Sequence, residues 1–150
     1  MPRSLAGVFL AASVVAVACG RGSVAVEIDT RHDACRFCRM TVSDVRFAAQ
    51  IVAPGDEPLV FDDLGCLGRY VGGGGTVRSD AVIFVADHRT KAWIAAPSAT
   101  FTRVDALETP MSSHLIAHAD RASRDADGAA AGGTEVAWSE IVPATGGNAR

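Results

Sequence analysis

The chain has 150 residues and a formal net charge of −3, with 14 basic and 17 acidic side chains. No arginine- or lysine-rich arm occurs, which argues against a nucleic-acid-binding protein. This length suits one compact unit or two very small ones.

Residues 1–18 have the pattern of a secretory signal peptide. Arg3 precedes an apolar stretch over residues 5–17, and small residues stand directly before Cys19. The apolar stretch is about 13 residues long, which is shorter than the roughly 20 residues that a membrane-spanning helix needs. We therefore expect the leader to be removed.

The cysteine at the cleavage point resembles a bacterial lipobox, in which Cys19 is acylated. A plain secreted protein and an uncleaved anchor are the alternatives. Several acyl chains together give stable anchoring, so we expect a lipoprotein on the extracytoplasmic side of a membrane, with residues 19–34 as a flexible tether. Gly20 follows the cysteine in place of a retaining aspartate, which favours the outer membrane if the bacterium is Gram-negative.

Residues 35–91 predict a strand-strand-helix-strand unit. A turn rich in proline and glycine, residues 54–58, separates two apolar segments and predicts a hairpin. Asp62 or Asp63 can cap the following helix, and the glycines at 72–75 end it. The strands are expected over residues 47–53, 59–61 and 81–86, and the helix over residues 64–71.

Residues 92–142 predict a second unit with the same order, although few residues are identical between the halves. Asp120 is expected to cap a short alanine-rich segment that ends at Gly132 and Gly133. The strands are expected over residues 92–96, 100–104, 114–119 and 135–142, and residues 143–150 as a disordered tail. The predicted fold class is α+β, with two small similar halves.

The segment over residues 35–40 places two thiols and one thioether close together. Only three methionines occur in the chain, one of them at the start of the leader, so Met40 beside Cys35 and Cys38 is a distinctive choice. Soft sulfur ligands select Cu(I) among the common metals, which favours a copper-handling protein. The alternative is a structural Cys35–Cys38 disulfide, although so short a loop stabilises little through chain entropy.

Three further residues have two interpretations each. Met111 follows Pro110 and is either a core side chain or a remote thioether ligand. His114 is either an auxiliary ligand or a surface histidine at a strand edge. Cys66 is either a small buried hydrophobe or a third thiol at the site, and three cysteines with a histidine could also bind zinc. An odd number of cysteines after lipidation of Cys19 leaves at least one thiol free or ligating.

The sequence offers no sign of catalytic machinery, since no nucleophile elbow, zinc-protease motif, phosphate loop or dinucleotide fingerprint occurs. A thiol–disulfide oxidoreductase that uses Cys35 and Cys38 is the alternative from another class. It would need a strand before the cysteine pair and a helix after it, and polar segments flank the pair instead. A purely structural lipoprotein is the third possibility.

Several motifs occur together: Cys35-x-x-Cys38-x-Met40-x-Val42-Ser43-Asp44-x-Arg46-Phe47-Ala48-Ala49-Gln50, Phe61-Asp62-Asp63-Leu64-Gly65-Cys66-Leu67, Trp93-Ile94 and Thr109-Pro110-Met111. In this combination, from the leader to about Trp138, the sequence resembles the NosL family of nitrous-oxide-reductase accessory lipoproteins.

The resemblance implies a membrane-anchored, non-enzymatic Cu(I) metallochaperone that delivers copper to nitrous oxide reductase, with another copper protein as the alternative client. It also implies an α+β fold of two similar halves. The copper ligands it implies are Cys38, Met40 and Met111, with Cys35 as an auxiliary thiol. Arg39 stands where the family commonly has glycine, so ligand geometry or affinity is expected to differ.

Overall fold

The structure, a computed structural model, describes residues 23–143. The predicted signal peptide, Cys19 and residues 144–150 of the predicted tail lie outside these residues. Within the described part of the chain, no helix is both long enough and apolar enough to cross a membrane.

The first sheet has four antiparallel strands in the order β2-β1-β3-β4. They are β1 (Ala49–Val52), β2 (Leu59–Phe61), β3 (Val82–Ala86) and β4 (Trp93–Ala95). The predicted β1–β2 hairpin is confirmed, with Gln50 opposite Val60. All four residues of β1 are buried, because this strand has neighbours on both edges and is covered on both faces.

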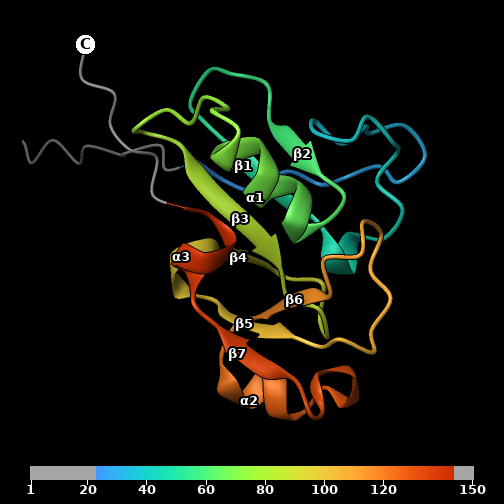
Figure 1. Cartoon of the computed structure of the whole chain (residues 1–150). Coiled ribbons are helices and arrows are strands. Elements are labelled where there is room, and N and C mark those ends of the chain that lie inside the picture. The colour runs from blue at the N-terminus through green and yellow to red at the C-terminus, as the bar shows by residue number, and fades with distance from the viewer. Residues whose placement is uncertain (1–22, 144–150) are drawn as a thin grey trace, which may run out of the picture.

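The second sheet has three antiparallel strands in the order β6-β5-β7. They are β5 (Thr100–Arg103), β6 (Leu115–His118) and β7 (Thr134–Val136). The helices are α1 (Leu64–Gly72), α2 (Arg121–Asp125) and α3 (Trp138–Ile141), with 3₁₀ turns η1 (Val45–Phe47), η2 (Ala96–Ser98) and η3 (Gly128–Ala130). In Figure 1, α1 lies on the first sheet and α2 lies beyond the second.

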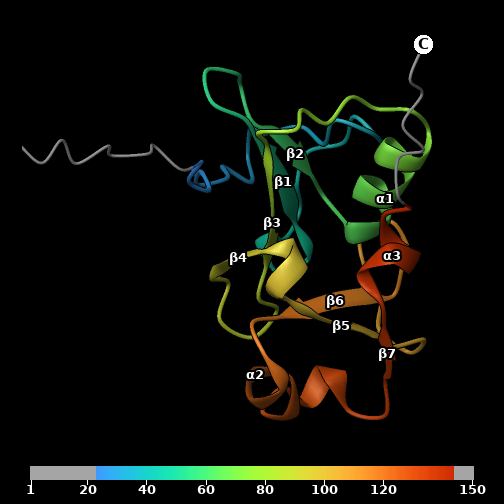
Figure 2. The same cartoon turned by 90° about the vertical axis from the view of Figure 1, so that its left-hand side faces the viewer.

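The α+β fold class is confirmed, and the two sheets have the same topology. In the first, β1, β2, α1 and β3 follow one another and pair in the order β2-β1-β3. In the second, β5, β6, α2 and β7 follow one another and pair in the order β6-β5-β7. The strand expected to open the second half, β4, pairs with β3 and extends the first sheet. In Figure 2, β1 and β3 run up the view while β5 and β6 run across it.

The main hydrophobic core lies between α1 and the sheets. The helix buries Leu64, Leu67 and Val71 on one face together with Cys66, as its amphipathic pattern predicts. Side chains of both sheets join the same cluster, including Phe61 from β2. The two sheets therefore share a core, and the end of α1 that carries Cys66 lies inside it.

A direct backbone link also joins the sheets. Asp87, which follows β3, forms a parallel bridge with Ala117 of β6, and the N–H of His88 donates to the Ala117 carbonyl oxygen (2.8 Å). This link positions the loop after β3 against the end of β6.

The segment before Cys35 packs on the first sheet from the start of the described residues. The Val26 N–H donates to the side-chain oxygen of Gln50 (2.8 Å), and the side-chain amide of Gln50 donates to the Val26 carbonyl (3.0 Å). Gln50 is fully buried, and Ile28 is buried nearby in a small cluster with Val42. The buried side-chain amide of Gln50 needs hydrogen-bond partners, and the Val26 backbone supplies them. Part of the segment expected as a tether therefore contacts the fold.

The prediction of one strand over residues 135–142 is wrong. β7 ends at Val136 and α3 begins at Trp138. The Glu140 carboxylate accepts a hydrogen bond from the Ala137 N–H (3.0 Å), which satisfies an N–H at the helix start. The Trp138 ring stacks on Phe101 of β5 (centroids 5.3 Å apart). Alternation of apolar residues could not reveal this local cap.

Candidate metal centre

A tight turn carries Cys35, Cys38 and Met40. The N–H of Cys35 donates to the Met40 carbonyl oxygen (2.7 Å), and the N–H of Arg39 donates to the Cys35 carbonyl oxygen (3.0 Å). Arg39 has a φ of 67°, in the left-handed region that costs a side chain free energy and that glycine adopts readily. The turn therefore suits glycine at this position, and the arginine holds the same backbone conformation under some strain.

The turn is attached to β2 and to the start of α1. The N–H of Arg36 donates to the Val60 carbonyl oxygen on β2 (2.7 Å). The chain then passes from β2 into α1, whose N-cap residue Asp63 accepts a hydrogen bond from the Gly65 N–H (2.6 Å). Cys66 lies in the first turn of this helix, so local geometry brings it to the turn that carries the other cysteines.

The three thiols form one cluster. The sulfur atoms of Cys35, Cys38 and Cys66 all lie within 4.8 Å of one another, a spacing that a single metal ion could bridge. Cys35 and Cys66 are fully buried and Cys38 is half-buried, and all three are free thiols. The structure thus joins the predicted pair to Cys66, for which the sequence left both a structural role and a place at the site open.

The hydrogen bonds in this cluster place negative charge on Cys35. The Cys66 thiol donates to the Cys35 sulfur, which lowers the pKa of Cys35 against the opposing effect of burial, and backbone amides add to this lowering. The same interaction, together with burial, raises the pKa of Cys66. Burial is the main cause of a raised pKa at Cys38. These effects favour the thiolate form at Cys35 and the thiol forms at Cys66 and Cys38.

Asp63 also brings Met111 to this end of α1. Its Oδ2 atom accepts hydrogen bonds from the Thr109 hydroxyl (2.7 Å) and from the Met111 N–H (3.1 Å). Met111 is partly buried and packs against the main core, as does Cys38. The segment from Thr109 to Met111 is thus attached to the residue that caps the helix carrying Cys66.

Met40 lies on the outer side of the cluster. It is 48% exposed, and Phe37 on the same turn is 40% exposed. The turn that carries the two cysteines therefore exposes two large apolar side chains. Among the predicted site residues, Cys35 is therefore buried and Met40 is exposed.

His114 does not join the sulfur cluster. Its Nδ1 atom lies 2.8 Å from the Leu107 carbonyl oxygen, and its N–H donates to the Thr109 hydroxyl (3.2 Å). Its φ is 59°, so it belongs to a tight turn before β6. The hydrogen bond between the His114 ring and the Leu107 carbonyl oxygen, together with the one to Thr109, gives this histidine a structural role in the segment around Thr109.

A second cluster of potential ligands consists of His88, His118 and Asp127, and no sequence pattern predicts it. The two histidines are far apart in the chain and show no ligand-like spacing. They meet because the backbone link between Asp87 and Ala117 aligns the end of β3 with β6. Only the sheet topology could have predicted this contact.

The profile of the NosL family matches residues 25–145, and the chain belongs to this family. No curated protein matches the sequence.

A solved structure shows the same fold. It is the crystal structure of the copper chaperone NosL from Shewanella denitrificans, which is 17% identical to this chain with a TM-score of 0.60. The match covers 81% of this chain and 98% of the other. This similarity supports the arrangement of two sheets described above.

Proposed function

We propose that this protein is a copper chaperone that binds Cu(I) at the sulfur cluster and passes it to a client. The observation that carries the proposal is the cluster of three cysteine sulfurs within 4.8 Å, in a chain of the NosL family. Soft thiolate and thioether ligands favour Cu(I). The name of the Shewanella protein, a copper chaperone, agrees with this function.

We assign the copper ligands to Cys38, Met40 and Met111. Cys38 lies in the turn between the buried thiols and the surface, and Met40 lies outside it. Met111 belongs to the segment that is attached through its N–H to Asp63, the N-cap residue of the helix that carries Cys66. Cys35 and Cys66 would form an inner pair that supplies negative charge and can take over as ligands.

The different exposure of these ligands suits transfer of the ion. Thioethers carry no proton, so Met40 and Met111 can bind and release copper without proton exchange. Cys38 must lose its proton to bind, so affinity is expected to fall at low pH. A ligand from the client could replace the exposed Met40 first, while the buried thiols still hold the ion.

The test is the double variant Met40→Leu, Met111→Leu, which removes both thioethers with little change in volume. We expect Cu(I) affinity to fall at least about tenfold in competition with a chromogenic Cu(I) chelator, with unchanged circular dichroism. Phe37→Leu is the matched control, because it alters an exposed apolar side chain on the same turn without removing sulfur. Equal competition by the double variant and the wild type would refute the ligand assignment.

We further propose that the client is nitrous oxide reductase and that Cys19 carries a lipid anchor. The support is the family resemblance and the leader sequence. Copper transfer to metal-free nitrous oxide reductase, measured by appearance of its copper absorption bands, tests the client. Membrane fractionation of a Cys19→Ser variant tests the anchor, and unchanged sedimentation with membranes would contradict it.

We propose a non-enzymatic role, which the surroundings of the cysteine pair support. Cys35 and Cys38 lie in a turn and not at the start of a helix, and the pKa of Cys38, the more exposed of the two, is raised. Thiol–disulfide oxidoreductases need the accessible thiol to be acidic. Insulin reduction that proceeds without copper would instead support the redox alternative.

A further inference from the structure

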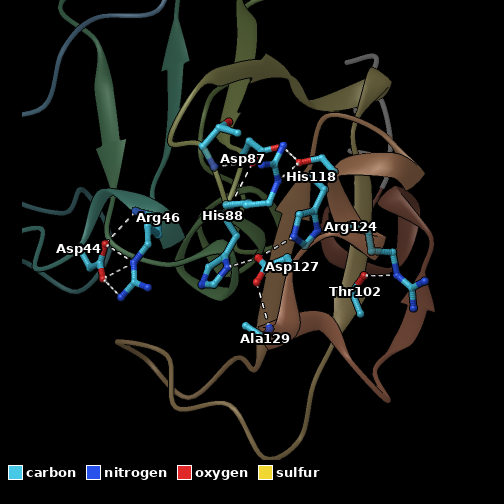
Figure 3. A network of polar contacts seen from close by, with 12 residues as sticks. Asp44, Arg46, Asp87, His88, Thr102, His118, Arg124, Asp127 and Ala129 are labelled. Carbon is cyan, nitrogen blue, oxygen red and sulfur yellow. Dashed lines mark hydrogen bonds and ion pairs between the residues drawn. The ribbon is translucent and has the colours of Figure 1, made fainter.

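His88, His118 and Asp127 form a buried cluster around one carboxylate oxygen. Oδ2 of Asp127 lies 2.6 Å from Nδ1 of His88 and 3.0 Å from Nε2 of His118. His118 is fully buried, His88 is 5% exposed, and the Asp127 side chain is 11% exposed. Figure 3 shows the carboxylate between the two imidazole rings.

Each of the three side chains is held by a different element. His88 follows β3 and is fixed by its N–H bond to the Ala117 carbonyl oxygen (2.8 Å). His118 ends β6. The second oxygen of Asp127 accepts a hydrogen bond from the Ala129 N–H (3.0 Å) at the start of η3. The cluster is therefore preorganised, and the Asp127 carboxylate keeps one oxygen for the histidines.

The hydrogen bonds of this cluster are incomplete. The other nitrogen of each ring, Nε2 of His88 and Nδ1 of His118, is buried without a hydrogen-bond partner among the described residues. The ring of Phe47 packs against His88 (centroids 5.1 Å apart). These two nitrogens lie on the far side of each ring from Asp127, so they are not the atoms that would bind an ion beside it. With a metal on the facing nitrogens, they would carry the ring protons and would need an acceptor such as water.

We propose that His88, His118 and Asp127 are the ligands of a divalent metal ion of the zinc class. Two imidazoles and one carboxylate are a ligand set that Zn²⁺ commonly takes, with water or another ligand completing the coordination. Zn–N and Zn–O bonds of about 2.0–2.2 Å require the facing atoms to move apart slightly from their present hydrogen-bond distances. The turn between α2 and η3 that carries Asp127 can supply this movement, because a short loop constrains it less than a strand.

The site would differ from the sulfur cluster in metal preference. It contains no sulfur, so it disfavours Cu(I), whereas imidazole and carboxylate suit divalent ions. The inference rests on its own residues and does not depend on the proposed copper function. Either proposal can fail without the other.

The experiment is a Zn²⁺ titration of the metal-free protein followed by imidazole ¹⁵N NMR. This measurement assigns metal binding to individual ring nitrogens, so zinc bound by the cysteines does not interfere. We expect Nδ1 of His88 and Nε2 of His118 to shift to metal-bound values together. In Asp127→Asn, the zinc affinity of these rings should fall at least about tenfold, while the control His32→Asn, which alters an exposed histidine, should leave it unchanged.

Two results would overturn the proposal. One is the absence of any change in the His88 and His118 rings at excess Zn²⁺, with zinc held only by sulfur or by His32. The other is equal zinc affinity of these rings in Asp127→Asn and the wild type. If the variant does not fold, the titration of the unaltered protein still decides between a metal site and a purely structural hydrogen-bond network.

Discussion

Asp63 connects three features that the sequence presents separately. It caps α1, and it accepts hydrogen bonds from the Thr109 hydroxyl and from the Met111 N–H. The sequence predicts the cap, because an aspartate before an apolar helix is typical of that position. It does not predict the contacts with Thr109 and Met111, because these come from a segment 46 to 48 residues away.

Asp63→Ala is expected to lower the free energy of unfolding by about 2–4 kcal/mol, since it removes a helix cap and leaves the buried Thr109 hydroxyl without its charged partner. Urea unfolding measures this loss. Asp105→Ala, at an exposed position near the same segment, is the control and should change stability by less than about 0.5 kcal/mol. Equal stability of the two variants would show that Asp63 does not hold the segment.

The residues of the candidate site were predictable to different degrees. Cys35, Cys38 and Met40 adjoin one another in the sequence, so their proximity was evident. Cys66 had two possible roles, and its contact with Cys35 depends on how β2 leads into α1. His88 and His118 were missed, because the link between two sheets brings them together.

At the scale of elements, the packing of α3 on α1 depends on a small residue. A side-chain carbon at Gly68 would collide with the carbonyl oxygen of Ile141 in α3. At Gly72, in the same helix, the nearest atom to such a carbon would be 3.8 Å away, on Pro143. Both glycines belong to the same helix, but only Gly72 leaves room for a side-chain carbon.

We expect Gly68→Ala to lower the free energy of unfolding by about 1–3 kcal/mol, because α3 must shift to relieve the collision. Gly72→Ala is the matched variant and should be neutral or stabilising by up to about 1 kcal/mol, since alanine favours helix without a collision. Thermal or urea unfolding of both variants provides the comparison. A stabilising effect at both positions would mean that α3 does not pack as described.

Most helices and strands were predictable, because their apolar spacing and turn residues agree with the final structure. α1 and the β1–β2 hairpin are examples. The structure of residues 135–142 was not predictable in this way. Their apolar residues alternate as in a strand, yet the segment divides between β7 and α3. There, a side-chain cap and the stacking of Trp138 on Phe101 outweigh the local pattern.

At the scale of the whole molecule, Asp87 holds the two sheets together. Its Oδ1 accepts the backbone N–H groups of Arg89 and Thr90 (3.0 and 2.8 Å), and its Oδ2 accepts the Ala119 N–H and the Ser123 hydroxyl (2.8 and 2.7 Å). Although burial favours the neutral acid, these hydrogen bonds hold the pKa of Asp87 well below its usual range. The carboxylate is therefore the form that the fold stabilises.

Because the pKa of Asp87 is lower in the folded than in the unfolded state, its contribution is present at neutral pH. It is lost as the pH falls below the unfolded value of about 3.9 toward the folded one. Asp87→Asn should be less stable than the wild type by at least about 2 kcal/mol at pH 7, and the difference should shrink below about pH 4. Urea unfolding at several pH values tests this, and a difference that stays constant with pH would contradict it.

The α+β class and the repeated order of elements follow from the sequence, because each half carries its own turn and helix signals. The place of β4 does not follow. As an isolated apolar segment, it fits either sheet, and only pairing with β3 assigns it to the first.

The attachment of Met111 to Asp63 has a consequence for when the proposed copper site can exist. Its ligands come from the turn before β1 and from the loop between β5 and β6, with Cys66 of α1 beside them. An unfolded chain would offer the sulfur atoms of this turn segment without Met111 and Cys66 beside them, and this partial set of ligands would hold the ion more weakly. Full copper retention would then arise only after both sheets have joined, so metal occupancy would report that maturation of the chaperone itself is complete.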